Sequence, residues 1–229
     1  MEIVPGIHQV DGVNGNSYII AREKLTIIDT GLPGSGKKIL AYIKDEIHRN
    51  PQEIEAIVIT HYHMDHTGGI KAIRAAAPGA KIAVHQKEAD YVSGKIQPPI
   101  HKGLRGVFLR LVTAVMNPGF FSPDIILNDG DQIGDLVCVY LPGHTSGSIG
   151  LLDKSARAFF CGDTLRSDGN HLLRGPEQFT MDLKEETQSL EKIASLDFDI
   201  LLVGHGVPLK SEASEKVREF VKKISVTVK

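Results

Sequence analysis

The stretch Thr60-His-Tyr-His-Met-Asp-His66 places three imidazoles and one carboxylate within seven residues. It directly follows the apolar run Ala56-Ile-Val-Ile59, which is typical of a strand covered on both faces. Imidazole nitrogens and carboxylate oxygens are preferred ligands of zinc and similar divalent metals. Without a metal, the same groups would form a costly polar cluster beside an apolar strand. The stretch therefore predicts a metal site at the end of a buried strand.

Backbone alternation indicates how this stretch could serve two metals. In an extended chain His61, His63 and Asp65 would share one side. A turn at Asp65-His66, followed by Gly68-Gly69, would aim His66 differently from its neighbours. One short loop is then able to provide ligands for two adjacent ions.

Three further candidate ligands each follow an apolar run and stand beside a glycine. They are His144 in residues 141–148, Asp163 in residues 159–164 and His205 in residues 201–208. Glycine permits tight turns and close backbone approach, so we expect strand ends from both halves of the chain to converge on one cleft. Each residue alone is weak evidence, but together with the loop they indicate one shared site.

The hydrophobic pattern predicts two successive halves, each made of strands followed by helices. In the first half, short strands at residues 7–29 precede a helix after Gly34, and further strands and helices alternate up to residue 92. In the second half, strands at residues 126–163 precede a helix at 183–195, a strand at 199–204 and a final helix. We expect one α/β domain over residues 1–229, with two sheets covered by helices.

Residues 93–124 interrupt this pattern and are predicted to be a helical insertion. Within it, residues 104–121 carry apolar side chains at helical spacing, broken by Arg105, Arg110 and an Asn-Pro-Gly stop. This pattern predicts an amphipathic helix that packs on the domain, forms a substrate lid, makes a dimer contact or lies at a membrane surface.

Composition limits the classes of partner. The net charge is −2, so nucleic acid is not an expected partner, and no segment is apolar enough to predict a membrane span. The N-terminal residues lack the pattern of a secretory signal, which favours a cytoplasmic protein. Cys138 and Cys161 lie in apolar runs and are predicted to be buried thiols. A homodimer remains open.

The motifs that contain these ligands resemble those of the metallo-β-lactamase superfamily. His-Tyr-His-Met-Asp-His at 61–66 matches its H-x-H-x-D-H signature, and residues 141–148, 161–164 and 204–206 match its later histidine and aspartate motifs. The resemblance extends from Asp29 to Gly206. It implies a four-layer αβ/βα sandwich with metals at one edge between two sheets. It assigns His61, His63 and His144 to one metal, Asp65, His66 and His205 to the other, and Asp163 to a bridge between them.

Departures from other branches narrow the expected reaction. β-Lactamases of this superfamily usually carry cysteine or another non-carboxylate residue at the position of Asp163, and flavodiiron oxygen reductases usually carry glutamate at that of His63. The full ligand set resembles hydroxyacylglutathione hydrolases and quorum-signal lactonases. The former have a basic C-terminal extension for glutathione, whereas this chain ends one helix after His205, so glutathione specificity is not expected. The nucleases of the superfamily usually add an RNA-handling arm or a second domain, and neither is expected in this sequence.

The resemblance leads to a mechanistic hypothesis. Two metal ions, expected to be zinc with iron or manganese as alternatives, would hold a bridging hydroxide that attacks an ester, lactone or thioester bond of a small molecule. Asp65 would shuttle the proton. Asp29 would either orient a ligand histidine or cap a turn.

Other readings stay open. A mononuclear iron sulfur dioxygenase, a phosphodiesterase, or a protein with an inert structural metal could share the fold. Residues 31–38, GLPGSGKK, mimic a phosphate-binding loop, but Lys38 stands where that loop needs serine or threonine, so nucleotide binding is not expected. Specificity is predicted to reside in residues 93–124 and 164–178. His171, Arg166 and Arg174 are either members of a solvated loop or residues that border the cleft.

Overall fold

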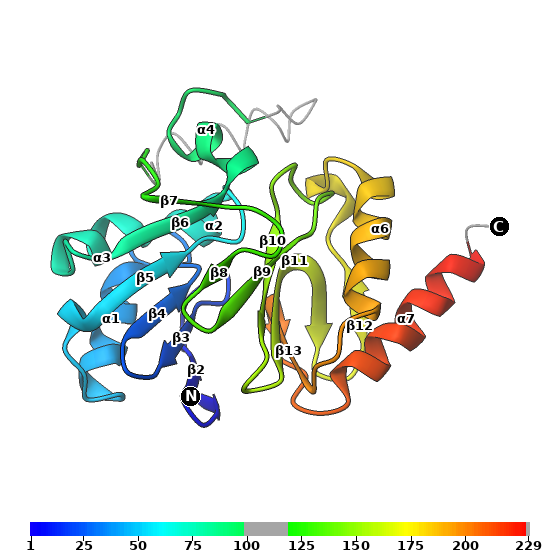
Figure 1. Cartoon of the computed structure of the whole chain (residues 1–229), viewed down its shortest axis with the longest axis horizontal. Coiled ribbons are helices and arrows are strands. Elements are labelled where there is room, and N and C mark those ends of the chain that lie inside the picture. Colours follow the sequence, from blue (N-terminus) through cyan, green and yellow to red (C-terminus); the bar gives the residue numbers. More distant parts are fainter. Residues whose placement is uncertain (99–118, 228–229) are drawn as a thin grey trace. The chain divides into compact units, whose positions relative to one another are not determined.

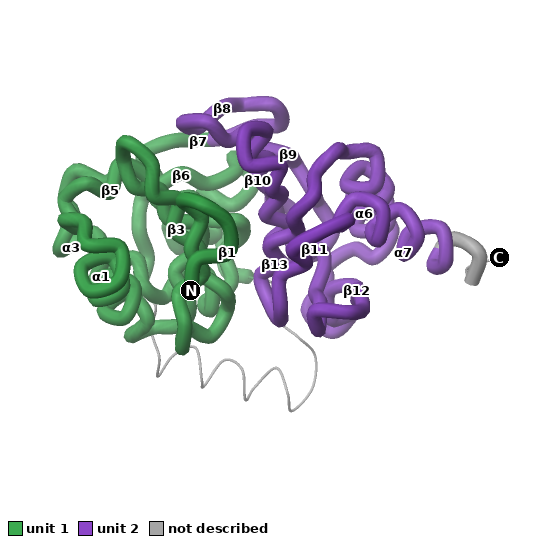
Figure 2. Tube along the Cα trace, turned by 90° about the horizontal axis from the view of Figure 1, so that it is seen from below, with its two compact units in different colours: residues 1–126 green, residues 127–229 purple. Residues whose placement is uncertain are grey.

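The computed structural model describes residues 1–98 and 119–227. Two compact units make up the chain, residues 1–126 and residues 127–229 (Figure 2). The prediction of a single domain with an insertion at residues 93–124 stays a prediction. The expected amphipathic helix at 104–121 falls almost entirely outside the described residues.

The first unit is built on a mixed sheet whose strand order follows the chain, β1-β2-β3-β4-β5-β6-β7 (Figure 1). Neighbouring strands from β1 to β4 are antiparallel, whereas β4, β5 and β6 run parallel. The strands are Glu2–Val4, Ile7–Gln9, Tyr18–Ala21, Leu25–Ile28, Ile54–Val58, Lys81–His85 and Ile125–Leu127. The helices are α1 (Ser35–Asp45), α2 (Met64–Thr67), α3 (Ile70–Ala76) and α4 (Ala89–Val92), with the 3-10 turns η1 (Pro51–Glu53) and η2 (Gln86–Glu88).

Helices α1 and α3 pack against this sheet because both carry an apolar stripe. Ile39 and Ile43 of α1 and Ile73 of α3 are fully buried in one cluster with Ile27 and Ile57 of the sheet. Burial of a side chain of this size contributes about 1.5–3 kcal/mol. The buried apolar residues Ala56, Ile57 and Val58 of β5 fit its central position between β4 and β6. Residues 61–66 form the His-rich loop. The strand that precedes this loop is therefore paired with a neighbouring strand on both edges.

The described part of the second unit is a six-stranded sheet with two α-helices and one 3-10 helix. The strands run β12-β11-β10-β9-β8, and β13 pairs in parallel with β11. Their bounds are β8 (Gln132–Ile133), β9 (Leu136–Tyr140), β10 (Ile149–Asp153), β11 (Ala158–Asp168), β12 (Leu172–Arg174) and β13 (Ile200–Val207). The helices are η3 (Glu177–Phe179), α6 (Leu183–Ala194) and α7 (Ala213–Thr227). Leu190, Ile193 and Val217 of α6 and α7 are buried against Phe159 and Leu201 of the sheet.

Two features of the second unit differ from the prediction. β11 does not end near Asp163 but continues to Asp168, and the expected loop at residues 164–178 contains β12 and η3. β12 forms because Leu165, Arg166 and Ser167 continue β11 and pair with residues 172–174 in an antiparallel hairpin. Cys138 and Cys161 are buried free thiols, as predicted, and burial raises the pKa of Cys138 to about 12. Among the described residues, no helix is long and apolar enough to cross a membrane.

Candidate metal centre

The His-rich loop of the first unit joins β5 to α2. His61 comes three residues after β5, and Met64 begins the helical turn that contains Asp65 and His66. The turn starts earlier than expected, because the backbone N–H groups of His66 and Thr67 both donate to the carbonyl of His63. The extended stretch therefore ends at His63, and Asp65 lies on the first turn of α2 rather than on a continued strand.

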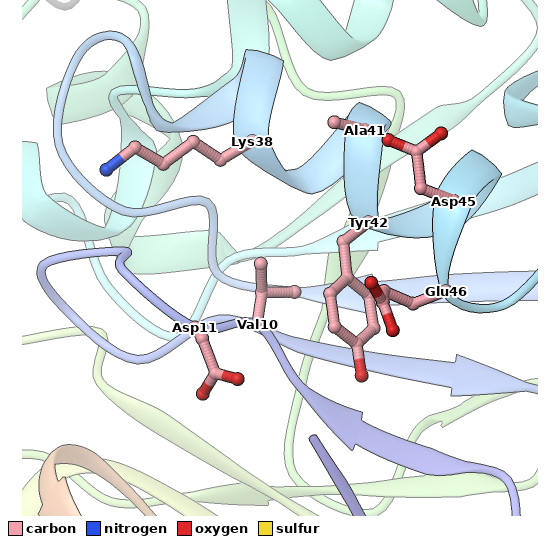
Figure 3. A pocket seen from close by; sticks show the side chains of 7 residues that line it. All are labelled: Val10, Asp11, Lys38, Ala41, Tyr42, Asp45 and Glu46. Atoms are coloured by element: carbon pink, nitrogen blue, oxygen red, sulfur yellow. The ribbon is translucent and has the colours of Figure 1, made fainter.

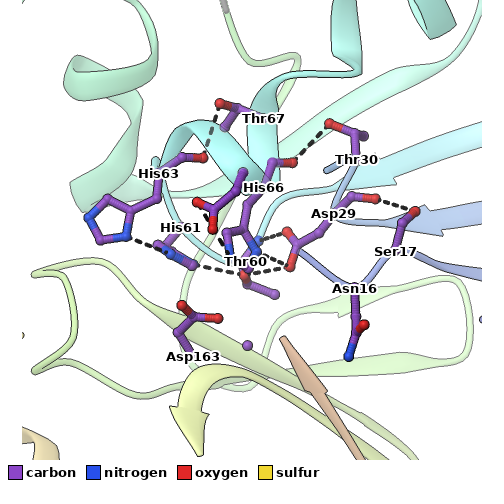
Figure 4. A network of polar contacts seen from close by, with 12 residues as sticks. Asn16, Ser17, Asp29, Thr30, Thr60, His61, His63, His66, Thr67 and Asp163 are labelled. Atoms are coloured by element: carbon purple, nitrogen blue, oxygen red, sulfur yellow. Dashed lines mark hydrogen bonds and ion pairs between the residues drawn. The ribbon is translucent and has the colours of Figure 1, made fainter. Parts of the chain in front are cut away.

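The three histidines of the loop lie close together (Figure 4). Nε2 of His61 is 2.9 Å from Nδ1 of His63, and the ring centroids of His61 and His66 are 4.0 Å apart. His61 and His66 are fully buried, whereas 30% of the Asp65 side chain is exposed. Oδ1 of Asp65 is 4.0 Å from Nε2 of His66. Sequence and structure thus agree that these four side chains form one polar group.

Asp29 supports the loop from the end of β4. Its carboxylate accepts hydrogen bonds from Nδ1 of His66 and from both the backbone N–H and the hydroxyl of Thr60, each at 2.8 Å. Asp29 is itself buried and has a φ of 56°, in the left-handed region that aspartate tolerates better than most residues. Of the two roles expected for Asp29, the structure shows the one in which its carboxylate orients a candidate ligand.

These hydrogen bonds also select the tautomers of two rings. The hydroxyl of Thr60 has one proton and donates it to Asp29, so its oxygen acts as the acceptor for Nδ1 of His61 at 3.0 Å. Asp29 likewise accepts the Nδ1 proton of His66. Nε2 of both rings therefore keeps a lone pair, which is the form of histidine that binds a metal.

Glycines bring the backbone of the preceding loop against the His-rich loop. A Cβ on Gly36 would lie 2.4 Å from the carbonyl oxygen of Gly69, and a Cβ on Gly68 would lie 2.2 Å from the backbone nitrogen of Pro33. The N–H of Gly68 donates to the carbonyl of Gly31 at 2.8 Å. Gly31 and Gly36 of GLPGSGKK thus lie against residues 68–69, which gives this phosphate-loop mimic a structural explanation.

The second unit gathers its three candidate ligands around one carboxylate oxygen. Oδ2 of Asp163 is 3.5 Å from Nε2 of His144 and 3.3 Å from Nε2 of His205. His144 lies in the loop between β9 and β10 and is buried, as is Asp163. His205 is partly exposed. These three residues therefore lie close together within this unit.

The positions of Asp163 and His205 within their strands differ from the prediction. Both lie inside strands, β11 and β13, rather than at strand ends. The register between β11 and β13 is irregular between Phe160 and Arg166, and Gly162 has a φ of 51°. A bulge of this kind re-aims side chains without ending the strand. A Cβ on Gly204 would lie 2.2 Å from Oδ1 of Asp163, so glycine at 204 makes room for the carboxylate.

The loop of His144 is held by the segment that precedes α6. The backbone N–H groups of Met181 and Asp182 donate to the carbonyl of Gly143 at 2.9 and 3.0 Å. Gly143 has a φ of 131°, and a Cβ there would lie 2.3 Å from the backbone nitrogen of Glu186. Close backbone packing therefore fixes the position of this loop.

Three residues that were expected either to border the cleft or to lie in a solvated loop have distinct environments. Arg174 forms an ion pair at 2.9 Å with the fully buried Glu186, and its guanidinium is therefore occupied within the unit. Arg166 is the strand partner of His205, and its Nε donates to the carbonyl of Arg174 at 3.0 Å. His171 is 79% exposed and contacts Asp168.

A surface pocket of the first unit lies apart from these candidate ligands. Figure 3 shows it beside α1, with polar lining side chains that include Lys38, Tyr42, Asp45 and Glu46. None of its lining residues is a candidate metal ligand. The candidate metal ligands therefore lie outside the lining of this pocket.

The chemistry of the donor set fits a divalent metal. Each unit offers buried imidazole nitrogens together with at least one carboxylate, and no candidate ligand is a soft thiolate. The candidates are His61, His63, Asp65, His66, His144, Asp163 and His205. Zinc, iron and manganese all accept such a set.

Comparison with known proteins identifies the class. Residues 10–205 match the family described as the metallo-beta-lactamase superfamily, and the chain belongs to it. It is a hydrolase of that superfamily, with His and Asp side chains as candidate metal ligands.

Two curated relatives and one solved structure show the range of similarity. The probable metallo-hydrolase YflN of Bacillus subtilis (strain 168) is 28% identical over 91% of this chain and 86% of its own length. A hydroxyacylglutathione hydrolase of Francisella tularensis subsp. holarctica is 32% identical over 67% of this chain, which spans only 50% of that enzyme. A crystal structure of a metallo-beta-lactamase family protein from Thermus thermophilus has a TM-score of 0.73 at 18% identity, covering 98% of this chain and 81% of that one. The predicted α/β metallo-β-lactamase fold is thereby confirmed.

Proposed function

We propose that this hydrolase uses a dinuclear metal site to cleave an ester, lactone or thioester bond in a small molecule. The observation that carries the proposal is the position of Asp163, whose Oδ2 lies within 3.5 Å of the Nε2 atoms of two histidines. A carboxylate oxygen in that position suits a ligand that two metal ions share. The aspartate at position 163 also distinguishes this chain from the β-lactamase pattern, in which a cysteine or another non-carboxylate residue is usual at that position.

The proposed assignment of ligands to the two metals is the one that the family motifs imply. His61, His63 and His144 would hold one metal, Asp65, His66 and His205 the other, with Asp163 common to both. Zinc is the expected ion. When bound, such metals polarise a carbonyl group and lower the pKa of water to near neutrality.

The chain's own residues would then orient the ligands and move a proton. Asp29 and Thr60 keep the Nε2 atoms of His66 and His61 available, which pre-organises the site before a metal arrives. Asp65 is more exposed than Asp163, so it is better placed to exchange a proton with substrate or water. We assign Asp65 the role of accepting a proton during attack and returning it to the leaving group.

The test combines metal analysis with activity. Purified wild-type protein is expected to contain about two equivalents of metal and to hydrolyse members of a panel of esters, lactones and thioesters. His61→Ala and Asp163→Ala should each lose metal, and their kcat/KM should fall by more than about 100-fold, the loss that changes to outer-shell partners alone can cause. His171→Ala is the matched control, because this exposed histidine lies outside the candidate set.

Several outcomes would overturn the proposal. Full activity of either ligand variant would exclude the assignment. One equivalent of iron together with oxygen consumption on a persulfide would instead indicate a dioxygenase. Turnover confined to phosphodiesters in the same panel would indicate the phosphodiesterase alternative.

A further inference from the structure

Tyr62 stands between two candidate ligands, and its backbone is held from outside the loop. Its N–H donates to Oε2 of Glu88 at 2.6 Å. Glu88 is fully buried and comes three residues after the end of β6, the strand that runs parallel to β5. A carboxylate that is removed from water needs a specific reason to be there, because burial of a charged or polar group is costly unless it is hydrogen-bonded.

Helix capping is one reason for a carboxylate at this position, and Glu88 does not show it. Glu88 is the residue that precedes α4, where a side chain commonly caps the helix. Its side chain makes no such capping bond. The carboxylate instead reaches residue 62, which is 26 positions earlier in the chain.

A contact between two aromatic rings also joins the segment of Glu88 to that of Tyr62. The ring of Tyr62 stacks on that of Tyr91 in α4, with centroids 4.7 Å apart and planes inclined by 26°. Its other neighbour is His63, whose ring lies edge-on at 4.8 Å. Burial raises the pKa of the Tyr62 phenol, as does the nearby Glu88, so the ring stays neutral. Residues 88–91 therefore hold Tyr62 by its backbone and by its side chain.

The consequence for the neighbouring histidines is geometric. Glu88 accepts a hydrogen bond from the N–H of the peptide bond between His61 and Tyr62. The stacked ring of Tyr62 limits rotation at that residue. The two contacts thus restrain the chain between His61 and His63, whose ring nitrogens are 2.9 Å apart. Metal ligands need to be held to within a fraction of an ångström, and outer-shell partners commonly do this.

We propose that Glu88 is a positioning residue that sets the spacing of His61 and His63 for metal binding. This role rests on the proposed function, because it requires that these histidines bind a metal. This positioning role requires only that the side chain at residue 88 accept a hydrogen bond. It does not require that this side chain be charged.

The experiment measures zinc affinity of the metal-free protein by competition with a chromophoric chelator. Glu88→Leu removes the acceptor and should weaken zinc binding by about 10-fold to 100-fold, the range typical of outer-shell partners. Glu88→Gln keeps an acceptor oxygen and should bind zinc within about threefold of wild type, below the loss expected of outer-shell changes. Tyr91→Leu removes the stacked ring and provides a second route to the same weakening if Glu88→Leu does not fold.

A control separates positioning from general stability. Glu53→Gln disturbs the capping box that Glu53 forms with Asn50 at η1, far from the His-rich loop in sequence. It should lower the thermal midpoint of the metal-free protein and leave zinc affinity unchanged.

The outcomes distinguish the two proposals. Wild-type protein that binds no zinc, iron or manganese would overturn the proposed function. Wild-type protein that binds metal, together with folded Glu88→Leu and Tyr91→Leu variants of unchanged affinity, would overturn the role of Glu88 alone. An equal loss in Glu88→Gln and Glu88→Leu would also contradict it, because the first variant retains the acceptor.

Discussion

The two units provide candidate ligands in opposite ways. In residues 1–126 they come from one stretch of six residues, 61–66, and Asp29, Thr60 and Glu88 hold that stretch by accepting hydrogen bonds from it. In residues 127–229 they come from three separate elements that meet at one carboxylate, and glycines provide the space. Hydrogen bonds position the candidate ligands of residues 1–126, whereas close backbone packing positions those of residues 127–229. Substitutions should therefore act on the two halves through different physical effects.

Gly204→Ala should produce the largest effect, because it removes space beside Asp163. The added Cβ would lie 2.2 Å from Oδ1 of Asp163 and 2.9 Å from backbone atoms of Gly162, so the carboxylate must move. A displacement of about 1 Å at a reacting centre can lower the rate by about 100-fold, and we expect at least that loss in kcat/KM. Gly79→Ala is the control, since a Cβ there meets no atom within 4 Å. Equal activity of the two variants would show that the second half tolerates movement.

Arg174→Met should come next, because it leaves the buried Glu186 without its ionic partner. The guanidinium of Arg174 is partly exposed, so we expect the free energy of unfolding at neutral pH to fall by about 2 kcal/mol, somewhat less than for a fully buried pair. Arg157→Met, at an exposed pair of aspartates, is the control and should show a smaller loss. Urea denaturation measures both.

The pH dependence of Arg174→Met has a definite sign. Burial raises the pKa of Glu186 above its ordinary value of 4.5, and Arg174 opposes that shift. Without Arg174 the pKa should rise further, so the folded variant binds more protons than the unfolded chain between pH 4.5 and the raised pKa. Its stability should therefore increase relative to wild type as pH falls from 7 to 5. A constant difference across this range would show that the deficit comes from packing rather than charge.

Asp29→Asn should have the smallest effect of the three. Asparagine also tolerates the positive φ at position 29, but its single carbonyl oxygen cannot accept all three hydrogen bonds that the carboxylate receives. We expect zinc affinity to fall by about 10-fold, at the low end for an outer-shell partner. Asp45→Asn, at the end of α1, serves as the control in the same chelator assay. A variant with wild-type affinity would mean that Thr60 and the backbone hold the loop without the carboxylate.

This difference between the two units explains which features could be predicted from the sequence. The His-rich loop was predictable because its candidate ligands lie within six residues and directly follow the apolar run at residues 56–59. The apolar periodicity of α1, α3, α6 and α7 likewise sufficed for the α/β class, since each buries one stripe against a sheet. Contiguous motifs and periodic helices carry their signal locally.

Features that depend on distant partners were not predictable in the same way. Nothing near Glu88 indicates that its carboxylate reaches Tyr62, and nothing near Arg174 indicates a buried partner at Glu186. The continuation of β11 past Asp163 depends on pairing with β12 and β13. The start of α2 at Met64 was missed because alternation was extended one residue pair too far. In the first three cases tertiary contacts outweighed the local pattern, whereas α2 begins at Met64 through local hydrogen bonds to the carbonyl of His63.

The order of strands has a consequence for synthesis of the chain. Strands β1 to β6 pair with their neighbours in sequence, so most contacts around the His-rich loop are available once residue 98 has left the ribosome. β11 instead gains its parallel partner only when β13, at residues 200–207, has been made. Local pairing forms faster than distant pairing, and domains generally fold from the N-terminus during translation. We expect the nascent chain to present the three loop imidazoles well before Asp163 has its final surroundings.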